Sequence, residues 1–198
     1  MTEANTRVSD HPIDPLFLHS WSPRAFLDEA ISETDLLTMI EAGRWAASSY
    51  NSQPWRFLYA RRGTPSWDKF LGLLIPFNQS WAKNASALVV LVSAETMRPP
   101  GSDKDVPSHS HSMDSGAAAG SFALQATMMG WQVHGMVGFD IPRAAIELNV
   151  PANHRVEAAY AIGRPGDKAT LPEGLQAREQ PSPRRPLSEI AIEGGFKA

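Results

Sequence analysis

The run Ala87-Leu88-Val89-Val90-Leu91-Val92 is apolar at every position, with no polar residue alternating along it. A strand with one face in water alternates polar and apolar side chains, whereas a strand covered on both faces is apolar throughout. This run therefore predicts a central strand with other elements packed on both of its faces.

The segments around this run have the patterns of helices and further strands. Ser32-Glu33-Thr34-Asp35 has the Ser-x-x-acid form of a helix start, and Leu36, Ile40, Gly43 and Ala47 follow it at helical spacing. Other helical patterns cover residues 67–74, 113–129 and 141–148, and strand-like patterns cover residues 55–60, 131–139 and 156–162. Strict alternation of strands and helices is not visible, so the pattern predicts an α+β or α/β fold.

The helical pattern over residues 113–129 is crowded with glycine, alanine and serine, and Gly130 follows it as a suitable C-terminal residue. Small side chains allow a helix backbone to approach its neighbours closely. We therefore expect this helix to be buried or to lie at a subunit interface.

Two segments lack any such periodicity. Residues 98–107 combine prolines, a glycine and alternating charges, which predicts a mobile surface loop. From Arg164 onward the chain is rich in proline and irregular. Such a tail cannot form its own core, so it either extends freely or wraps a neighbouring surface.

Length and composition limit the class of protein. The 198 residues predict one domain, residues 1–198, with a flexible N-terminus at 1–17 and an extended C-terminal arm at 165–198. There is no cysteine, which excludes disulfides, zinc–thiolate sites and thiol catalysis. The net charge of −3 without a basic run gives no support for nucleic acid as a partner. No apolar run is long enough for a membrane span and no signal peptide is visible, so we expect a cytoplasmic protein without a membrane partner.

The most informative polar segment is Ser48-Ser49-Tyr50-Asn51-Ser52-Gln53-Pro54-Trp55-Arg56-Phe57, between a helical and a strand-like pattern. Its hydroxyl and amide groups can present many hydrogen bonds to one planar ligand with polar edges. Neither a Gly-x-Gly-x-x-Gly motif nor a P-loop occurs, so the standard dinucleotide and nucleoside triphosphate cradles are absent.

This loop resembles the segment with which the nitroreductase family of FMN-dependent flavoenzymes grips its flavin. The order of the family's motifs agrees from about Leu18 to Leu187. The resemblance implies that Ser48, Ser49 and Asn51 contact the flavin, often that of the partner subunit. The alternative is that Asn51 and its neighbours only shape a turn.

Ser20-Trp21-Ser22-Pro23-Arg24-Ala25-Phe26 resembles the family's N-terminal Arg-x-Ser-x-Arg-x-Phe signature. The resemblance implies that Ser22 and Arg24 bind the FMN phosphate, ribityl chain and pyrimidine, and that Arg24 stabilises the reduced flavin at N1–O2. Ser20 stands where the family usually has arginine. FMN binding should be weaker for it, since a hydrogen bond to a charged group contributes roughly 1.5–3 kcal/mol. The alternative is a surface turn with a solvated arginine.

Three further matches complete the implied flavin site. Asn78 resembles the family asparagine near the pyrimidine ring, although it could simply be a helix N-cap. His134-Gly135-Met136-Val137-Gly138-Phe139-Asp140 resembles the segment whose backbone N–H, here from Val137 or Gly138, points at flavin N5. Within it, His134 is either a candidate acid or an ordinary histidine. Arg184 and Arg185 resemble the late arginine that returns to the phosphate, or they are a solvated pair on the tail.

A metal site is not expected. His109-Ser110-His111-Ser112-Met113-Asp114 contains possible ligands but lacks a second set at a recognisable spacing. Ser110 or Ser112 is better interpreted as the cap of the long helix, with Asp114 placed favourably against the helix dipole.

Taken with the patterns above, the resemblance implies an α+β fold. Its form would be a three-layer α/β/α sandwich around a mixed, mainly antiparallel sheet, in a homodimer with FMN at the subunit interface. It also implies an FMN-dependent oxidoreductase. A hydride would pass from NADH or NADPH through flavin N5 to a small-molecule acceptor, such as a nitroaromatic or quinone, in ping-pong order. The alternatives are a specialised flavoenzyme of the same fold, a flavin destructase or dehalogenase, or a non-catalytic flavin-binding protein.

Overall fold

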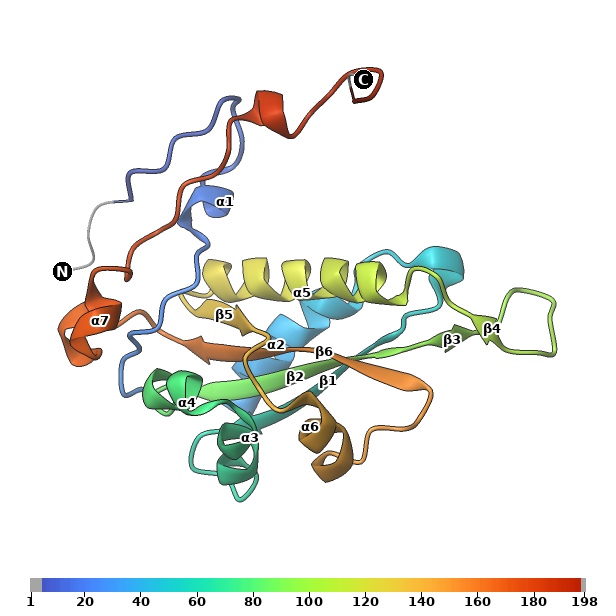
Figure 1. Cartoon of the computed structure of the whole chain (residues 1–198), viewed down its shortest axis with the longest axis horizontal. Coiled ribbons are helices and arrows are strands. Elements are labelled where there is room, and N and C mark those ends of the chain that lie inside the picture. Colours follow the sequence, from blue (N-terminus) through green and yellow to red (C-terminus); the bar gives the residue numbers. More distant parts are fainter. Residues whose placement is uncertain (1–4, 197–198) are drawn as a thin grey trace.

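The computed structural model describes residues 5–196 and places helices on both faces of a four-stranded antiparallel sheet (Figure 1). The strand order is β1 (Trp55–Arg61), β2 (Ala87–Ala94), β6 (His154–Gly163) and β5 (Gln132–Met136). Each pairing in this sheet is antiparallel. The predicted α+β class is therefore confirmed, with no parallel pair within the described part of the sheet.

Strand β2 is the predicted central strand, and every residue in it except Ala94 is buried. Its side chains alternate between two cores. Leu88 and Val90 lie in one core cluster, while Ala87 and Val89 lie in another on the opposite face. Burying one such Val or Leu side chain contributes about 1.5–3 kcal/mol, so both helical layers depend on this strand.

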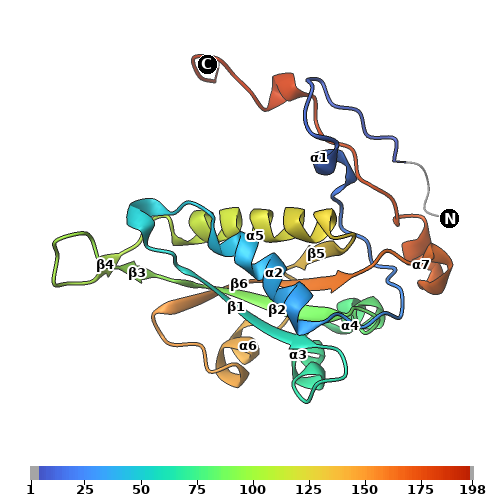
Figure 2. The same cartoon turned by 180° about the vertical axis from the view of Figure 1, so that it is seen from behind.

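Two layers of helices cover these faces. On one face lie α2 (Glu33–Arg44) and α5 (His111–Met128), and on the other lie α3 (Trp67–Leu73), α4 (Pro76–Ala82) and α6 (Ile141–Glu147) (Figures 1 and 2). The Ser32 hydroxyl accepts a hydrogen bond from the Asp35 backbone N–H at 2.9 Å, which confirms the predicted start of α2. A Cβ on Gly43 would lie 3.0 Å from the Ala118 carbonyl oxygen, so the small residues of α5 do allow α2 to approach closely.

Some predicted boundaries were wrong. Residues 98–107 are not wholly a loop, because β3 (Thr96–Met97) and β4 (Val106–Pro107) pair at its ends. Two-residue strands are too short to show an alternating pattern, and an ion pair between Arg98 and Asp105 at 2.8 Å closes this hairpin. Pro76 does more than end α3, since it also begins α4. The tail contains short helical turns at η2 (Lys168–Thr170), α7 (Glu173–Gln176) and η3 (Leu187–Glu189).

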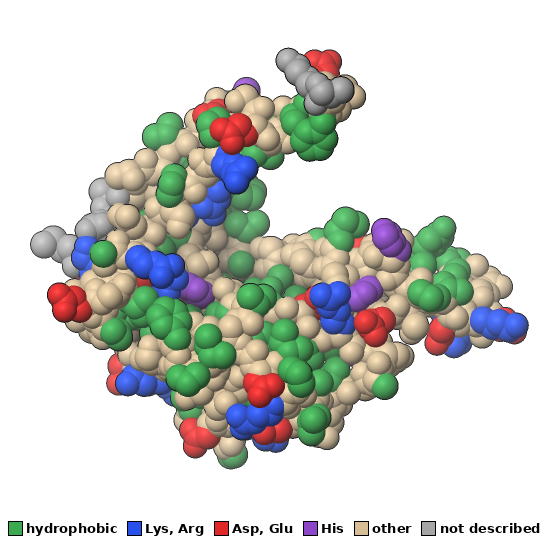
Figure 3. All heavy atoms as spheres, viewed as in Figure 1, with side chains coloured by type: hydrophobic (Ala, Val, Ile, Leu, Met, Phe, Trp, Pro, Cys, Tyr) green, Lys and Arg blue, Asp and Glu red, His purple; other side chains and the backbone are tan. Residues whose placement is uncertain are grey.

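The two ends of the described chain run side by side and project from the body (Figures 1 and 2). We call residues 5–20, which include α1 (Pro15–His19), and residues 180–196 the terminal arms. Arg7 Nε donates to the Ser182 carbonyl at 2.9 Å, and the Leu187 N–H donates to Asp10 Oδ2 at 3.1 Å. Figure 3 shows an open hollow between the arms and the body. Residues 1–4 and 197–198, which belong to the predicted flexible N-terminus and C-terminal arm, lie outside the described residues.

None of the helices within residues 5–196 has the length and apolar character that crossing a membrane requires.

Gly163, at the end of β6, offers a test of how tightly the start of the chain packs on the sheet. A Cβ there would lie 2.6 Å from Cγ of the buried Phe26 ring. We expect Gly163→Ala to lower the free energy of unfolding by about 1–3 kcal/mol, measured by urea denaturation, because Phe26 has no space to yield. Gly174→Ala is the matched control, since its Cβ would meet nothing within 4 Å. Equal stability of the two variants would contradict this packing.

Candidate functional site: a pocket lined by arginines

A pocket of about 480 Å³ opens where the start of the chain, strand β5 and the C-terminal segment meet. We call it the arginine pocket, because its lining includes Arg7, Arg24, Arg178 and Arg184. Ser22 and His134 also line it. The structure thus brings together three residues predicted from two separate motifs, namely Ser22, Arg24 and Arg184.

The positive charge in this pocket is only partly balanced. Glu179 is the acidic partner of Arg24, with 3.8 Å between its Oε2 and Arg24 Nη1. Burial lowers the pKa of Arg24, and the charge of Glu179 opposes that effect. Burial and the charge of Arg184 together lower the pKa of Arg7. Since arginine stays protonated in proteins, the pocket carries excess positive charge and suits an anion.

Glu179 also holds the backbone at Arg24 in place. Its Oε1 accepts hydrogen bonds from the N–H groups of Arg24 at 2.6 Å and Ala25 at 2.8 Å. Its side chain is only 3% exposed, and its Oε2 has no hydrogen-bond partner among the described residues. A buried carboxylate is costly unless it is paired, so these contacts hold Arg24 in a defined place beside the pocket.

His134 lies at the pocket wall in a defined tautomer. Its Nδ1 is 2.8 Å from the Ser22 carbonyl and 3.0 Å from the Pro23 carbonyl. Carbonyls only accept, so Nδ1 carries the proton and Nε2 of the neutral ring can accept. The ring also packs against Trp81, with 4.7 Å between centroids. His134 is therefore a packed histidine that keeps one acceptor available.

A second group of predicted residues surrounds the turn that follows β5. The Asn78 side chain donates to the Gly138 carbonyl at 2.9 Å, and a Cβ on Gly138 would lie 2.6 Å from Asn78 Nδ2. Asn78 is not a helix N-cap, because Ile75 occupies that position in α4. The Val137 side chain is 74% exposed. No described residue accepts a hydrogen bond from the backbone N–H of Val137 or Gly138.

The loop residues Ser48, Ser49 and Asn51 lie elsewhere. The Ser49 N–H donates to Asp114 Oδ2 at 3.1 Å, which ties the loop to the first turn of α5. The arginine pocket adjoins β5, which follows the other end of this 18-residue helix (Figure 1). A helix of that length spans about 27 Å. Within one chain, the loop and the pocket are therefore separated.

Arg185 is also outside the arginine pocket. It lines a neighbouring groove of about 710 Å³ between the terminal arms, together with apolar residues such as Phe17 and Ile190. Of the two adjacent arginines on the tail, only Arg184 lines both spaces.

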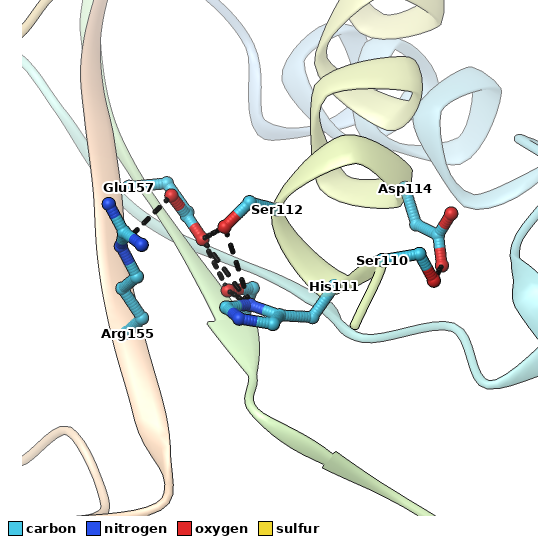
Figure 4. A network of polar contacts seen from close by, with 7 residues as sticks. Ser110, His111, Ser112, Asp114, Arg155 and Glu157 are labelled. Atoms are coloured by element: carbon cyan, nitrogen blue, oxygen red, sulfur yellow. Dashed lines mark hydrogen bonds and ion pairs between the residues drawn. The ribbon is translucent and has the colours of Figure 1, made fainter. Parts of the chain in front are cut away.

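The histidine-rich segment forms a hydrogen-bonded network at the start of α5 (Figure 4). The Ser93 and Ser112 hydroxyls both donate to Glu157 Oε1, at 2.5 and 2.6 Å, and His111 Nδ1 lies 2.7 Å from Ser93 Oγ. The predicted serine cap is confirmed in position but not in its hydrogen bond. Ser110 is the N-cap residue, but its hydroxyl donates to Asp114 Oδ2 at 2.9 Å and accepts no hydrogen bond from a described backbone N–H of the helix. Within residues 5–196, no group of three possible ligands could hold a metal ion.

Comparison with known proteins gives the family. Residues 19–74 match the model of the Nitroreductase family. A protein of Mycolicibacterium smegmatis, described as an uncharacterized 15.4 kDa protein in the ask 5′ region, is 32% identical over 148 residues, covering 70% of this chain and 95% of that protein. The chain belongs to the nitroreductase family.

Two solved structures are similar to this nitroreductase-family chain over all or nearly all of its length. One, described as an oxidoreductase containing FMN, is 45% identical with a TM-score of 0.94, and the match covers 100% of this chain and 99% of that chain. Another, described as a nitroreductase candidate from Desulfovibrio desulfuricans in complex with FMN, is 25% identical with a TM-score of 0.71 and covers 96% of this chain and 100% of that chain. The resemblance and the fold predicted from the sequence motifs are confirmed.

In this nitroreductase-family protein, sequence reasoning missed two arginines of the pocket and the acid that holds a third. Arg7 and Arg178 line the pocket, and Glu179 holds Arg24. None of them lies in a recognisable motif, because each reaches the pocket through contacts between segments far apart in the chain.

The environment of His134 predicts a pH dependence of stability. Burial, followed by the charge of Arg24, lowers the pKa of His134 from 6.5, and the hydrogen bonds to the Pro23 and Ser22 carbonyls only partly oppose this. The unfolded chain therefore takes up a proton more readily. The stability that the neutral His134 ring contributes is fully present above about pH 6.5 and is lost as pH falls through the lower pKa of the folded state.

We expect the purified protein without added ligand to lose more stability between pH 7.5 and pH 5 than its His134→Gln variant does, as measured by urea denaturation. The difference in unfolding free energy between the two proteins at pH 7.5 is the reference, since the side chain at position 134 is then uncharged in both. Parallel stability curves for the two proteins would contradict the assignment.

Proposed function

We propose that this protein is an FMN-dependent oxidoreductase. The observation that carries the proposal is the arginine pocket, which four arginines line and where, among the described residues, only Arg24 forms an ion pair, with the buried Glu179. Arginine forks match the oxygens of a phosphate group and form charge-assisted hydrogen bonds with it. The FMN-containing relatives support the choice of FMN as the anion.

The chain's own groups fit such a ligand. Arg24 would hold the flavin's pyrimidine side, and Ser22 and Arg184 would bind toward the phosphate. The N–H groups of Val137 and Gly138, which have no acceptor among the described residues, would be able to donate. The chemistry supplied by bound FMN would be a hydride relay through N5, from NADH or NADPH to a nitroaromatic, quinone or similar acceptor in ping-pong order.

The remaining work of the residues is positioning and charge stabilisation. Arg24, held through Glu179, would stabilise negative charge that develops on the ring, without reorganisation at the moment of reaction. Asn78 fixes the turn at Gly138 through its hydrogen bond to that carbonyl. His134 offers an acceptor at Nε2 and is not required as an acid.

We further propose a homodimer in which each site is completed by the partner. Ser48, Ser49 and Asn51 lie about one helix length, roughly 27 Å, from the arginine pocket of their own chain, so a second copy would bring its loop to this site. Residues 1–198 would form one domain, and of the predicted arm at 165–198 the projecting part, 180–196, would lie on the partner. The terminal arms project from the body beside an open hollow (Figure 3), and the second copy would lie against them.

The outer face of α5 supports this dimer. Gly116, Ala117 and Gly120 are exposed on it, and Met113 and Met128 are 72% and 67% exposed. An exposed apolar stripe with small residues allows close contact with another helix, and such patches often mark protein interfaces.

Gly120→Arg tests the dimer. A Cβ at Gly120 meets nothing within 4 Å in the single chain, so the fold should tolerate the substitution. We expect sedimentation to show a dimer for the wild type and monomer for Gly120→Arg, with loss of bound flavin. Ile146→Arg is the control, because Ile146 is 77% exposed on α6, on the opposite side of the sheet. A monomeric wild type that retains flavin would contradict the shared site.

The function itself is tested by the visible absorption spectrum of the purified protein with FMN. We expect a bound-flavin spectrum that bleaches under anaerobic NADH or NADPH and returns on addition of a nitroaromatic or quinone. Bound flavin that neither reductant bleaches would favour a specialised flavoenzyme or a binding role. Absence of bound flavin would overturn the proposal.

A further inference from the structure

Arg7, near the N-terminus, is held at the arginine pocket by hydrogen bonds to backbone carbonyls. Its Nη1 donates to the carbonyls of Ser20 at 2.7 Å and Leu18 at 3.2 Å, and its Nε donates to the Ser182 carbonyl at 2.9 Å. These bonds use the protons of Nη1 and Nε. No described residue accepts a hydrogen bond from Nη2, so one edge of the guanidinium remains available while its position is fixed.

The charge of Arg7 has no counter-charge in the described chain. No carboxylate within residues 5–196 forms an ion pair with Arg7, Arg178 or Arg184. The bonds from Arg7 go to neutral carbonyls, and the charge of Arg184 acts against it. Glu179, the one acid at the pocket, interacts with Arg24. The arrangement holds like charges together, which an added anion would relieve.

A purely mechanical role explains less of this geometry. Neutral amide donors could join the terminal arms to the Ser20 carbonyl without placing a guanidinium beside Arg184. The contact with Ser20 is also informative, because Ser20 stands where the family motif usually has an arginine. Arg7 lies outside the Ser20–Phe26 motif in the sequence, but its Nη1 contacts the Ser20 carbonyl.

We propose that Arg7 is a ligand of the phosphate monoester of FMN, acting with Arg184 from the terminal arms. The inference rests on the proposed FMN site and adds a residue to it. The arms would then belong to the binding site, and phosphate binding would hold them against the body of the protein.

The test compares FMN with riboflavin, which lacks the phosphate. Dissociation constants of both are measured by flavin fluorescence on the apoprotein of wild type and Arg7→Gln, where glutamine keeps amide donors for the carbonyls. We expect the Kd of FMN to rise by about 10- to 100-fold, as for loss of a hydrogen bond to a charged group. The Kd of riboflavin should stay within about 2-fold of wild type, because a phosphate-directed contact is worth nothing to a ligand without phosphate.

Two further variants sharpen the comparison. Arg7→Lys keeps the charge and should retain part of the preference for FMN. Arg143→Gln is the matched control, because Arg143 also donates to a backbone carbonyl, that of Gly72 at 2.8 Å, on the opposite side of the sheet. It should bind both flavins as the wild type does.

The outcomes separate this inference from the proposed function. If wild type prefers FMN and Arg7→Gln keeps that preference, Arg7 is not a phosphate ligand and the FMN site stands. If the affinities for FMN and riboflavin fall together, Arg7 only supports the arms, which also overturns the inference. If wild type binds neither flavin, both proposals fail.

Discussion

Burial of β2 on both faces is the constraint on which the rest of the molecule depends. Its side chains enter two separate cores, so α2 and α5 must cover one face while α3, α4 and α6 cover the other. A strand enclosed in this way has no side chain available to a ligand. The arginine pocket and the Ser48–Asn51 loop accordingly lie where elements end.

A second constraint is the buried carboxylate of Glu179. Leaving it unpaired would cost several kcal/mol, and its bonds to the Arg24 and Ala25 N–H groups offset much of that cost. The same contacts join the C-terminal segment to the start of the chain and orient Arg24. The balance of one acid against several arginines leaves the pocket positive, which is an unfavourable state until an anion enters it.

The loop at the other end of α5 stores conformational strain. Tyr50, Asn51 and Gln53 all have positive φ, at 51°, 54° and 47°, a region that non-glycine residues rarely adopt. The bond from the Ser49 N–H to the buried Asp114, and the bond from the Gln53 N–H to Ser48 Oγ, hold this shape. Such strain persists where the surroundings fix the backbone, and it is common at binding sites. Because the loop lies far from the arginine pocket, one chain by itself holds only part of the proposed site.

The sequence by itself determined the central strand, the start of α2, the close packing of α5 and the family, because each depends on a local pattern of apolar, capping or motif residues. Through the resemblance of its motifs it also predicted a shared site for Ser22, Arg24 and Arg184, and all three line the arginine pocket. Only the tertiary structure decided that Arg7 and Glu179 join them, that Arg185 turns into the adjoining groove, and that Ser48, Ser49 and Asn51 lie a helix length away. The bond from Arg7 to the Ser182 carbonyl spans 175 positions, and that from the Arg24 N–H to Glu179 spans 155. Contacts over such separations leave no periodicity in the sequence, since they arise from how the packed layers bring the ends of the chain together.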